Sequence, residues 1–470
     1  MVSTSRLARA LLLVGALAAP ALAQTGAGVA LPLTSPFRGG VPAAAATPGV
    51  LTLTPGDAIR HALERNLGVL LADQDRAAAD GGRWDALSRL LPTVRGTAGL
   101  TRRKTNLEAF GFPLGPSFPR VVGPYNVFDA RVFLEQALVD VSAVREKSAA
   151  THRLEAARHS VRGARELVVL VSANLYLEAL AADARAQAAR AQLDSSRAIH
   201  AQAQRLREGG IVAGLDVVRA EVRLSADEQR ATVAENEVQK SKLQLARVIG
   251  LPIGQEFVLI KELPEVPEQT MTLDDAVARA YASRPDFLAA LEDLRAAESA
   301  RGAAGAEALP SLRLAADYGT IGLTVGSALP TFSLTGLVEV PIFEGGKHQA
   351  RVAQADAALR KQQARVEDLR AEVYYDVRTA FLDLDATEQA LRTAGRARAL
   401  ADQQLTQSRD RFAAGVAGNI EVIQAQEAVA VAAEQYISAL YGRNIARAML
   451  AQSVGGAEEA VMRLIGSQTP

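Results

Sequence analysis

The feature that most constrains this chain is a glycine-centred segment that occurs twice. Residues 205–221 read RLREGGIVAGLDVVRAE and residues 411–426 read RFAAGVAGNIEVIQAQ, and an offset of 205 aligns them without a gap, with Asp216 on Glu421. In both copies a helical pattern leads in, glycines end it, and an acidic residue opens the next helix. Glycine adopts the left-handed and tight turns that end helices, and a carboxylate in the first turn interacts favourably with the helix dipole. Each copy therefore predicts the tip of a helical hairpin.

A second pair of matching segments extends the duplication well beyond the tips. Leu91-Pro92 recurs as Leu309-Pro310, at an offset of 218. We therefore predict two structural repeats, at residues 51–265 and 266–470. Because the offset falls from 218 to 205, the second repeat is shorter somewhere between these pairs. Loops tolerate such differences more easily than paired elements do, so we expect a longer loop in the first repeat, and we place both loops outside the cell.

After each Leu-Pro pair, apolar and polar residues alternate with the period of two that is typical of β-strands. Four strands are predicted, at about residues 93–102, 126–138, 310–322 and 331–342. Each is close to the 9–11 residues that cross a bilayer as a tilted strand. Seven of the twelve phenylalanines fall within 92–140 and 310–344, as aromatic girdles at the two membrane surfaces require. The edge of a soluble β-sandwich would give the same alternation.

Four strands cannot close a barrel by themselves, and open sheet edges are not tolerated in lipid. If these strands span a membrane, several chains must pool them. Two chains would supply eight strands and three would supply twelve. Four membrane-spanning strands per chain therefore require an oligomer, but the sequence pattern does not determine the number of chains.

Proline-free helical patterns follow the strand pairs. We predict long helices at about 141–208 and 346–412, tips at 209–214 and 413–418, and return helices at about 215–249 and 419–454. Leu154, Val161, Val168 and Leu175 recur every seven residues, the spacing of helices that coil around neighbours in a left-handed sense. A plain soluble coiled coil would explain these helices but not the strands. The expected fold class is mainly α-helical, with strands that contribute to a membrane β-barrel.

The N-terminus has the order of a secretory signal peptide. Arg6 and Arg9 precede the apolar run LLLVGALAAPALA, and small residues lead to a predicted cleavage between Ala23 and Gln24. Residues 1–23 are the predicted signal peptide, and the Pro-, Gly- and Ala-rich residues 24–50 are predicted to be a flexible lead. A transmembrane anchor is the alternative, but the run is short and contains a proline. Beyond it we expect no membrane-spanning helix.

Charge and motifs argue against most enzyme classes. Lys plus Arg and Asp plus Glu both number 52, so no net charge attracts nucleic acid, and the five histidines are scattered without metal-ligand spacing. The sequence contains no HExxH motif, no Walker loop and no dinucleotide-binding glycine motif. We expect no catalytic residue, no metal site and no cofactor.

Several segments, taken together, resemble the outer-membrane efflux (TolC-like) family. They are VEVPIFEGGKHQARVAQADAALR at 338–360, the second tip, and the repeat openings LTLTPGDAIRHALERN and MTLDDAVARAYASRPD. The resemblance covers about residues 51–455. It implies a homotrimer with a 12-stranded barrel in the outer membrane and a 12-helix tunnel through the periplasm. It also implies a passive exit duct that docks on a periplasmic adaptor (membrane fusion protein) and an inner-membrane transporter.

The resemblance places a periplasmic aperture at the tips, lined by Glu421, Gln424, Phe412 and Asp216. The family has a second acidic residue where this chain has Gln424, so each chain would offer a single carboxylate there. Glu421 and Gln424 lie three residues apart and so share a helix face. The family's tyrosine and basic latch residues correspond to Phe412 and Ala417, so its latch bonds are not expected here. Asp216 has Arg219 on the same face and is a candidate for a simple helix-end ion pair.

The glycines of the tips are the expected docking surface for the adaptor. They are Gly209, Gly210, Gly214, Gly415 and Gly418. The expected function is an outer-membrane channel that gives passive exit to drugs, toxic small molecules or secreted protein. The alternative is a periplasmic coiled-coil adaptor or scaffold that does not span the outer membrane. The sequence does not indicate which substrate is carried.

Overall fold

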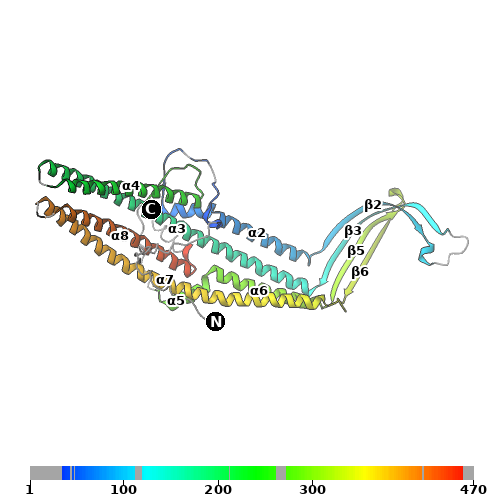
Figure 1. Ribbon diagram of the computed structural model, residues 1–470. Helices are drawn as coiled ribbons and strands as arrows, with labels where there is room; N and C mark the ends of the chain where they lie inside the picture. Colours follow the sequence, from blue (N-terminus) through cyan, green and yellow to red (C-terminus); the bar gives the residue numbers. More distant parts are fainter. Residues whose placement is uncertain are drawn as a thin grey trace, which may run out of the picture.

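The computed structural model describes residues 34–42, 45–46, 48–111, 119–210, 212–260, 271–414, 416 and 418–458. Over these residues the chain is elongated. A narrow sheet lies at one end, helices form the middle, and two helical hairpins end together at the other end (Figure 1). The predicted signal peptide, with its cleavage site between Ala23 and Gln24, lies outside the described residues. So do Gly415 and Ala417 of the second tip.

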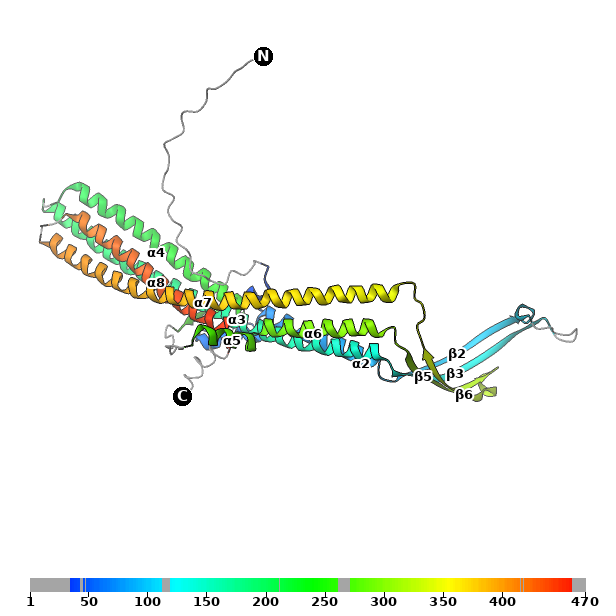
Figure 2. The same ribbon diagram turned by 90° about the horizontal axis from the view of Figure 1, so that it is seen from below.

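Helices make up most of the described chain. They are α1 (Pro55–Arg65), α2 (Leu67–Ser88), α3 (Val141–Glu208), α4 (Gly214–Val248), α5 (Leu273–Ser283), α6 (Pro285–Ala306), α7 (Lys347–Ala413) and α8 (Asn419–Ser453). α3 packs against α4, and α7 packs against α8, as two antiparallel hairpins (Figure 2). On the sheet side of the hairpins, α2, α3, α6 and α7 lie side by side in that order. The long helices therefore connect the sheet to the tips.

The helical spacing of apolar residues from Ala58 to Leu70 predicts one continuous helix from Leu53 to Leu91. The structure differs from this prediction. Residues Leu51–Leu53 form strand β1, which pairs in parallel with β4 (Phe257–Leu259). The helix then breaks at Asn66, which is fully buried and extended. Its side chain accepts a hydrogen bond from the backbone N–H of Gly68 at 2.9 Å and donates one to the carbonyl oxygen of Val248 at 3.2 Å. Asn66 thus ends α1, caps α2 and joins them to α4.

Within the predicted flexible lead of residues 24–50, the segment 34–42 is held against the helices by backbone hydrogen bonds between Val41 and Arg65 and between Leu67 and Gly39. Residues Pro36–Arg38 form a short 3-10 helix, and Phe37 packs against the core cluster around Tyr176. A Cβ atom added at Gly68 would lie 2.2 Å from the Phe37 ring, so the glycine makes room for this contact. The Pro-, Gly- and Ala-rich composition predicted a linker. Composition does not reveal that one large apolar side chain, Phe37, together with these backbone hydrogen bonds, is enough to hold the segment against the core.

The sheet is antiparallel throughout. Within the described residues it contains β2 (Thr93–Asn106), β3 (Val121–Val139), β5 (Ser311–Gly322) and β6 (Leu329–Glu339), in that order, so β2 and β6 are its edge strands. Residues 107–120 connect β2 to β3, whereas 323–328 connect β5 to β6, so the longer connection lies in the first repeat. β6 ends at Glu339 rather than at the predicted residue 342. Pro341 follows, and it has no N–H to continue the ladder.

The apolar core lies where the short helices cross the long ones. Tyr176 of α3 is buried, and its hydroxyl donates to the carbonyl oxygens of Leu53 at 3.0 Å and Ile260 at 2.8 Å. A second cluster joins α5 and α6 to Val373 and Val377 of α7. Among the described helices, one 18-residue window of α3 is apolar enough to cross a membrane, although 67% of that window is buried inside the chain. Its apolar residues belong to this core.

Candidate functional site: the two-faced sheet and the helical tips

One face of the sheet is apolar and exposed. The pairing aligns Val94, Leu134, Ala316 and Leu334 in one row across the four strands. A neighbouring row contains Val132, Tyr318 and Phe332. Val94 is 66% exposed and Phe332 is 76% exposed. An exposed apolar surface that covers a whole sheet face is rare in water-soluble monomers, and it suits contact with lipid.

The opposite face is polar and contains a charged network. Arg131 donates to both carboxylate oxygens of Asp129, at 2.7 and 2.6 Å, and to Asp317 on the next strand at 3.1 Å. Ser333 of β6 donates to Asp317 as well. Thr97 and Thr331 lie in the same row as Arg131. The strands thus place the charged network on one side, together with a few apolar residues such as Phe133 and Leu337, and an apolar surface on the other. A membrane strand with an aqueous interior requires such a division.

At the tips, the structure places Glu421 in the first turn of α8, as predicted. Its side chain is 44% exposed and forms an ion pair with Arg411 at the end of α7, with 3.5 Å between Oε2 and Nε. Asp216 pairs with Arg219 on its own helix at 3.5 Å. The spacing of Asp216 and Arg219 in the sequence predicted their ion pair. The pair between Glu421 and Arg411 was not predicted, because Arg411 lies on the other side of the glycine turn.

Gln424 is exposed and contributes to a groove of about 560 Å³ between α7 and α8. Gln404 of α7 and Glu427 of α8 also line this groove, and alanines form much of the remaining surface. Glu421 and Gln424 therefore share a helix face, but their surroundings differ. Glu421 has a cationic partner, whereas Gln424 lies beside the groove.

Phe412, predicted to lie at the aperture, is buried within this chain. Its side chain is only 7% exposed and packs with Ile199 of α3 and Val422 of α8. The expected placement at the aperture came from aligning Phe412 with a family aromatic residue. Without a hydroxyl group, the ring has no polar partner to hold it at a surface, and burial is favoured. Phe412 joins the two hairpins just behind their tips.

The tip glycines differ in their roles. Gly210 has a φ of +72°, which an L-residue adopts only at a cost, and it makes the turn that follows α3 together with Gly209. Gly214 is already the first residue of α4, one residue earlier than the predicted start of the return helix. Gly418 immediately precedes α8 in an extended conformation. The structure thus assigns the left-handed turn of the first tip to Gly210.

An ionic network between the hairpins was not predicted. Asp227 of α4 is 1% exposed and accepts hydrogen bonds from Arg223 at 2.9 Å, from Arg230 at 3.3 Å, and from Ser196 of α3. Arg223 and Arg230 also pair with Glu427 of α8, and Arg223 lowers the pKa of that carboxyl. The four-residue spacing of Arg223 and Asp227 could have indicated the intrahelical pair. Nothing in the sequence indicates the contact with Glu427, which is about two hundred positions away.

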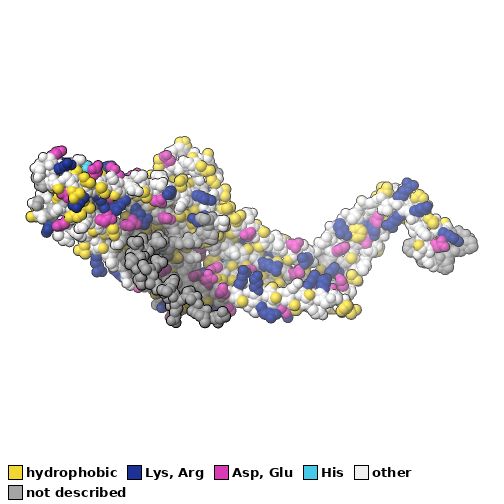
Figure 3. All heavy atoms as spheres, viewed as in Figure 1, with side chains coloured by type: hydrophobic (Ala, Val, Ile, Leu, Met, Phe, Trp, Pro, Cys, Tyr) yellow, Lys and Arg dark blue, Asp and Glu magenta, His cyan; other side chains and the backbone are white. Residues whose placement is uncertain are grey.

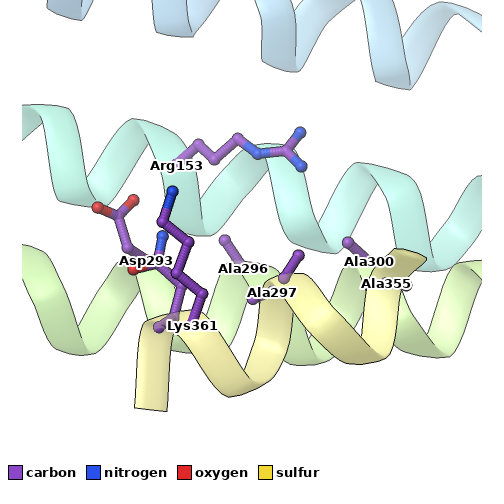
Figure 4. Close-up of a pocket in the computed structure, with 9 residues that line it drawn as sticks. Arg153, Asp293, Ala296, Ala297, Ala300, Ala355 and Lys361 are labelled. Atoms are coloured by element: carbon purple, nitrogen blue, oxygen red, sulfur yellow. The ribbon is translucent and has the colours of Figure 1, made fainter. Parts of the chain in front are cut away.

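A small cavity lies among the helices, closer to the sheet than to the tips (Figure 4). Its volume is about 300 Å³, and it lies between α3, α6 and α7, with alanines along α6 and α7 and with Arg153, Asp293 and Lys361 around them. Burial raises the pKa of Asp293. The alanines allow close approach of the helices. Within the described part of the chain, no group of three or more His, Cys, Asp or Glu side chains has the arrangement of a metal site.

Comparison with solved structures identifies the fold. The channel CmeC of Campylobacter jejuni superposes with a TM-score of 0.75 at 16% identity, covering 94% of this chain and 98% of CmeC. The outer membrane protein VceC of Vibrio cholerae superposes with a TM-score of 0.75 at 17% identity, covering 86% of this chain and 96% of VceC. The chain therefore has the fold of outer-membrane channel proteins.

The family follows from the sequence itself. Residues 58–251 and 276–456 match the sequence model of the family described as outer membrane efflux protein, and the chain belongs to that family. The protein is accordingly an outer-membrane protein of a family that transports rather than catalyses, and the resemblance stated from its motifs is confirmed.

Two curated relatives support the same assignment. The pyoverdine export outer membrane protein OpmQ of Pseudomonas putida is 24% identical over 61% of this chain, and the outer membrane protein OprJ of Pseudomonas aeruginosa is 28% identical over 66% of it. The matched regions span 62% of OpmQ and 65% of OprJ.

Proposed function

We propose that three copies of this chain form an efflux channel in which their sheets close one 12-stranded barrel and their helices continue as a 12-helix tunnel. The observation that carries the proposal is the two-faced sheet with two free edges. β2 and β6 end the described sheet, and their outer backbone groups would have no partner in lipid. Each unsatisfied group in a bilayer costs several kcal/mol. Closure with neighbouring copies removes both edges and encloses the polar face around Arg131.

In this arrangement the channel is a passive exit duct. The proposed route begins at the hairpin tips, runs along the helices and leaves through the barrel. We propose that a periplasmic adaptor docks at the tip glycines and that an inner-membrane transporter delivers the substrate. Drugs, toxic small molecules and secreted protein are all candidate substrates. The export role in the printed name of OpmQ supports the duct and does not identify the cargo of this chain.

Glu421 is the residue we propose to control ion passage at the aperture. Three copies would place three carboxylates in a ring that favours cations and binds divalent ions. Arg411 reduces this effect, because each carboxylate has a cationic partner 3.5 Å away. The ring would therefore be partly neutralised at rest.

Conductance of the purified protein in a planar bilayer tests the proposed function. We expect defined channels in the wild type, lower cation selectivity and weaker divalent block in Glu421→Ala, and higher cation selectivity in Arg411→Ala. Glu235→Ala is the matched control, because Glu235 is an exposed carboxylate that pairs with an arginine, Arg190, well inside α4 and away from the tips. Absence of channels would contradict the duct. Unchanged cation selectivity in both Glu421→Ala and Arg411→Ala would contradict the proposed role of Glu421 but not the proposed duct.

A further inference from the structure

The far end of the sheet has a strong excess of positive charge. Residues 101–128 contain four basic side chains, Arg102, Arg103, Lys104 and Arg120, and a single acidic one, Glu108. Arg102, Arg103 and Lys104 are consecutive and exposed near the end of β2. Basic side chains gather at this end of the sheet in Figure 3. Arg120 and Glu108 approach only to 3.9 Å, so the cluster keeps most of its charge.

The strand register places the neighbours Arg102 and Arg103 on opposite faces of β2. Arg102 lies opposite Asn126, on the same face of β2 as Val94 and Leu100, because side chains two residues apart share a face. Arg103 lies opposite Tyr125, on the polar face with Arg95. Arg102 is thus the first charged residue beyond the apolar surface, whereas Arg103 points to the side proposed as the barrel interior. Arg102 forms no ion pair with another described residue.

The distances suit a lipid headgroup. From Val94 to Arg102 the strand advances about 27 Å at about 3.4 Å per residue. A strand tilt of about 40° reduces this to about 21 Å along the membrane normal, which is comparable with the apolar band of about 25 Å that crosses an outer membrane. A basic side chain at this position extends along the apolar surface and reaches the headgroup level. Phosphate is the anion that a guanidinium group binds best, through two parallel hydrogen bonds.

We propose that Arg102 binds the phosphates of the glycolipid in the outer leaflet of the outer membrane. The inference rests on the proposed membrane-spanning sheet and on its far end facing outward. The charge of the cluster complements an anionic headgroup, and the adjacent apolar face receives the acyl chains of the same lipid. Three copies of Arg102 would surround the barrel at one depth and fix its position in the membrane.

The test measures lipid binding to the purified protein in a mild non-ionic detergent by native mass spectrometry. The probes are diphosphoryl lipid A and a dephosphorylated form with the same acyl chains. Wild-type protein should bind the phosphorylated probe more tightly, and 0.5 M salt should reduce that preference. Arg102→Gln should weaken binding of the phosphorylated probe about fivefold, as expected for one basic side chain at an anionic headgroup. Arg102→Lys should keep most of it.

Arg103→Gln is the matched control, because it removes the same charge one residue away on the opposite face. Equal losses in Arg102→Gln and Arg103→Gln, or no preference of the wild type for the phosphorylated probe, would overturn the proposal. So would full binding by Arg102→Gln. The oligomer mass recorded in the same spectra distinguishes this failure from failure of the proposed channel.

Discussion

At the scale of single residues, the described chain buries charge at Glu166, Asp227 and Arg284, and Asp227 is the most deeply buried of the three. Asp227 is almost completely buried and depends on Arg223, Arg230 and Ser196 for compensation. An uncompensated carboxylate in such a place is strongly unfavourable. The same arginines contact Glu427 on the other hairpin. The network therefore links the stability of α4 to the position of α8.

Arg223→Met should destabilise the protein by about 2–4 kcal/mol, because Asp227 stays buried with one strong partner fewer. The measurement is the midpoint of thermal unfolding, followed by loss of helical circular dichroism in detergent. Arg219→Met is the control. Its partner Asp216 is more exposed than Asp227, and a surface pair contributes at most about 1 kcal/mol. Equal shifts in the two variants would mean that the buried network contributes no special stability.

The burial of Glu166 predicts that the stability of the folded protein depends on pH. It is 9% exposed, and burial raises the pKa of its carboxyl from 4.5 to about 7. Between these values the folded protein holds a proton that the unfolded chain has lost, so stability falls as pH rises. The free energy of unfolding falls by at most about 3 kcal/mol between low pH and pH 7. Unfolding midpoints of Glu166→Gln should vary less between pH 5 and 7 than those of the wild type. Glu155 lies on the same helix, is more exposed than Glu166 and pairs with Arg158. Glu155→Gln should behave like the wild type, and a flattened profile there would contradict the assignment.

At the scale of elements, the sheet and the hairpins could be predicted because their periodicities are local. Alternation gave the strands, and proline-free seven-residue spacing gave α3 and α7. Contacts between distant segments could not be predicted in the same way. Asn66 breaks a helix whose apolar spacing continues past it, because its partners are backbone groups of Phe37 and Val248. The burial of Phe412 likewise depends on Ile199, in the other repeat.

The two faces of β6 predict opposite responses to the same substitution. Leu334→Arg places a charge on the apolar face, where it costs up to about 2–4 kcal/mol, depending on its depth in the bilayer. Thr335→Arg places the charge on the polar face, opposite Ala315 and in the row of Glu135. We expect much less Leu334→Arg than Thr335→Arg protein in the outer-membrane fraction of expressing cells. Similar amounts of both would show that the apolar face does not contact lipid.

At the scale of the whole molecule, the duplicated fold places the sheet at one end and both hairpin tips at the other (Figure 1). The sheet end provides the apolar face that the membrane requires, and the hairpin end carries the tips and their charged side chains (Figure 1). A single copy leaves two sheet edges open and its polar face uncovered. The proposed channel is therefore a property of the assembly rather than of one chain.

The mass of the protein extracted from outer membranes in a mild detergent tests the central claim most directly. Light scattering coupled to size-exclusion chromatography separates the protein mass from the detergent mass. The account predicts three copies of a chain of at most 49.6 kDa. A stable monomer or dimer would contradict the shared 12-stranded barrel and, with it, the proposed route through the membrane.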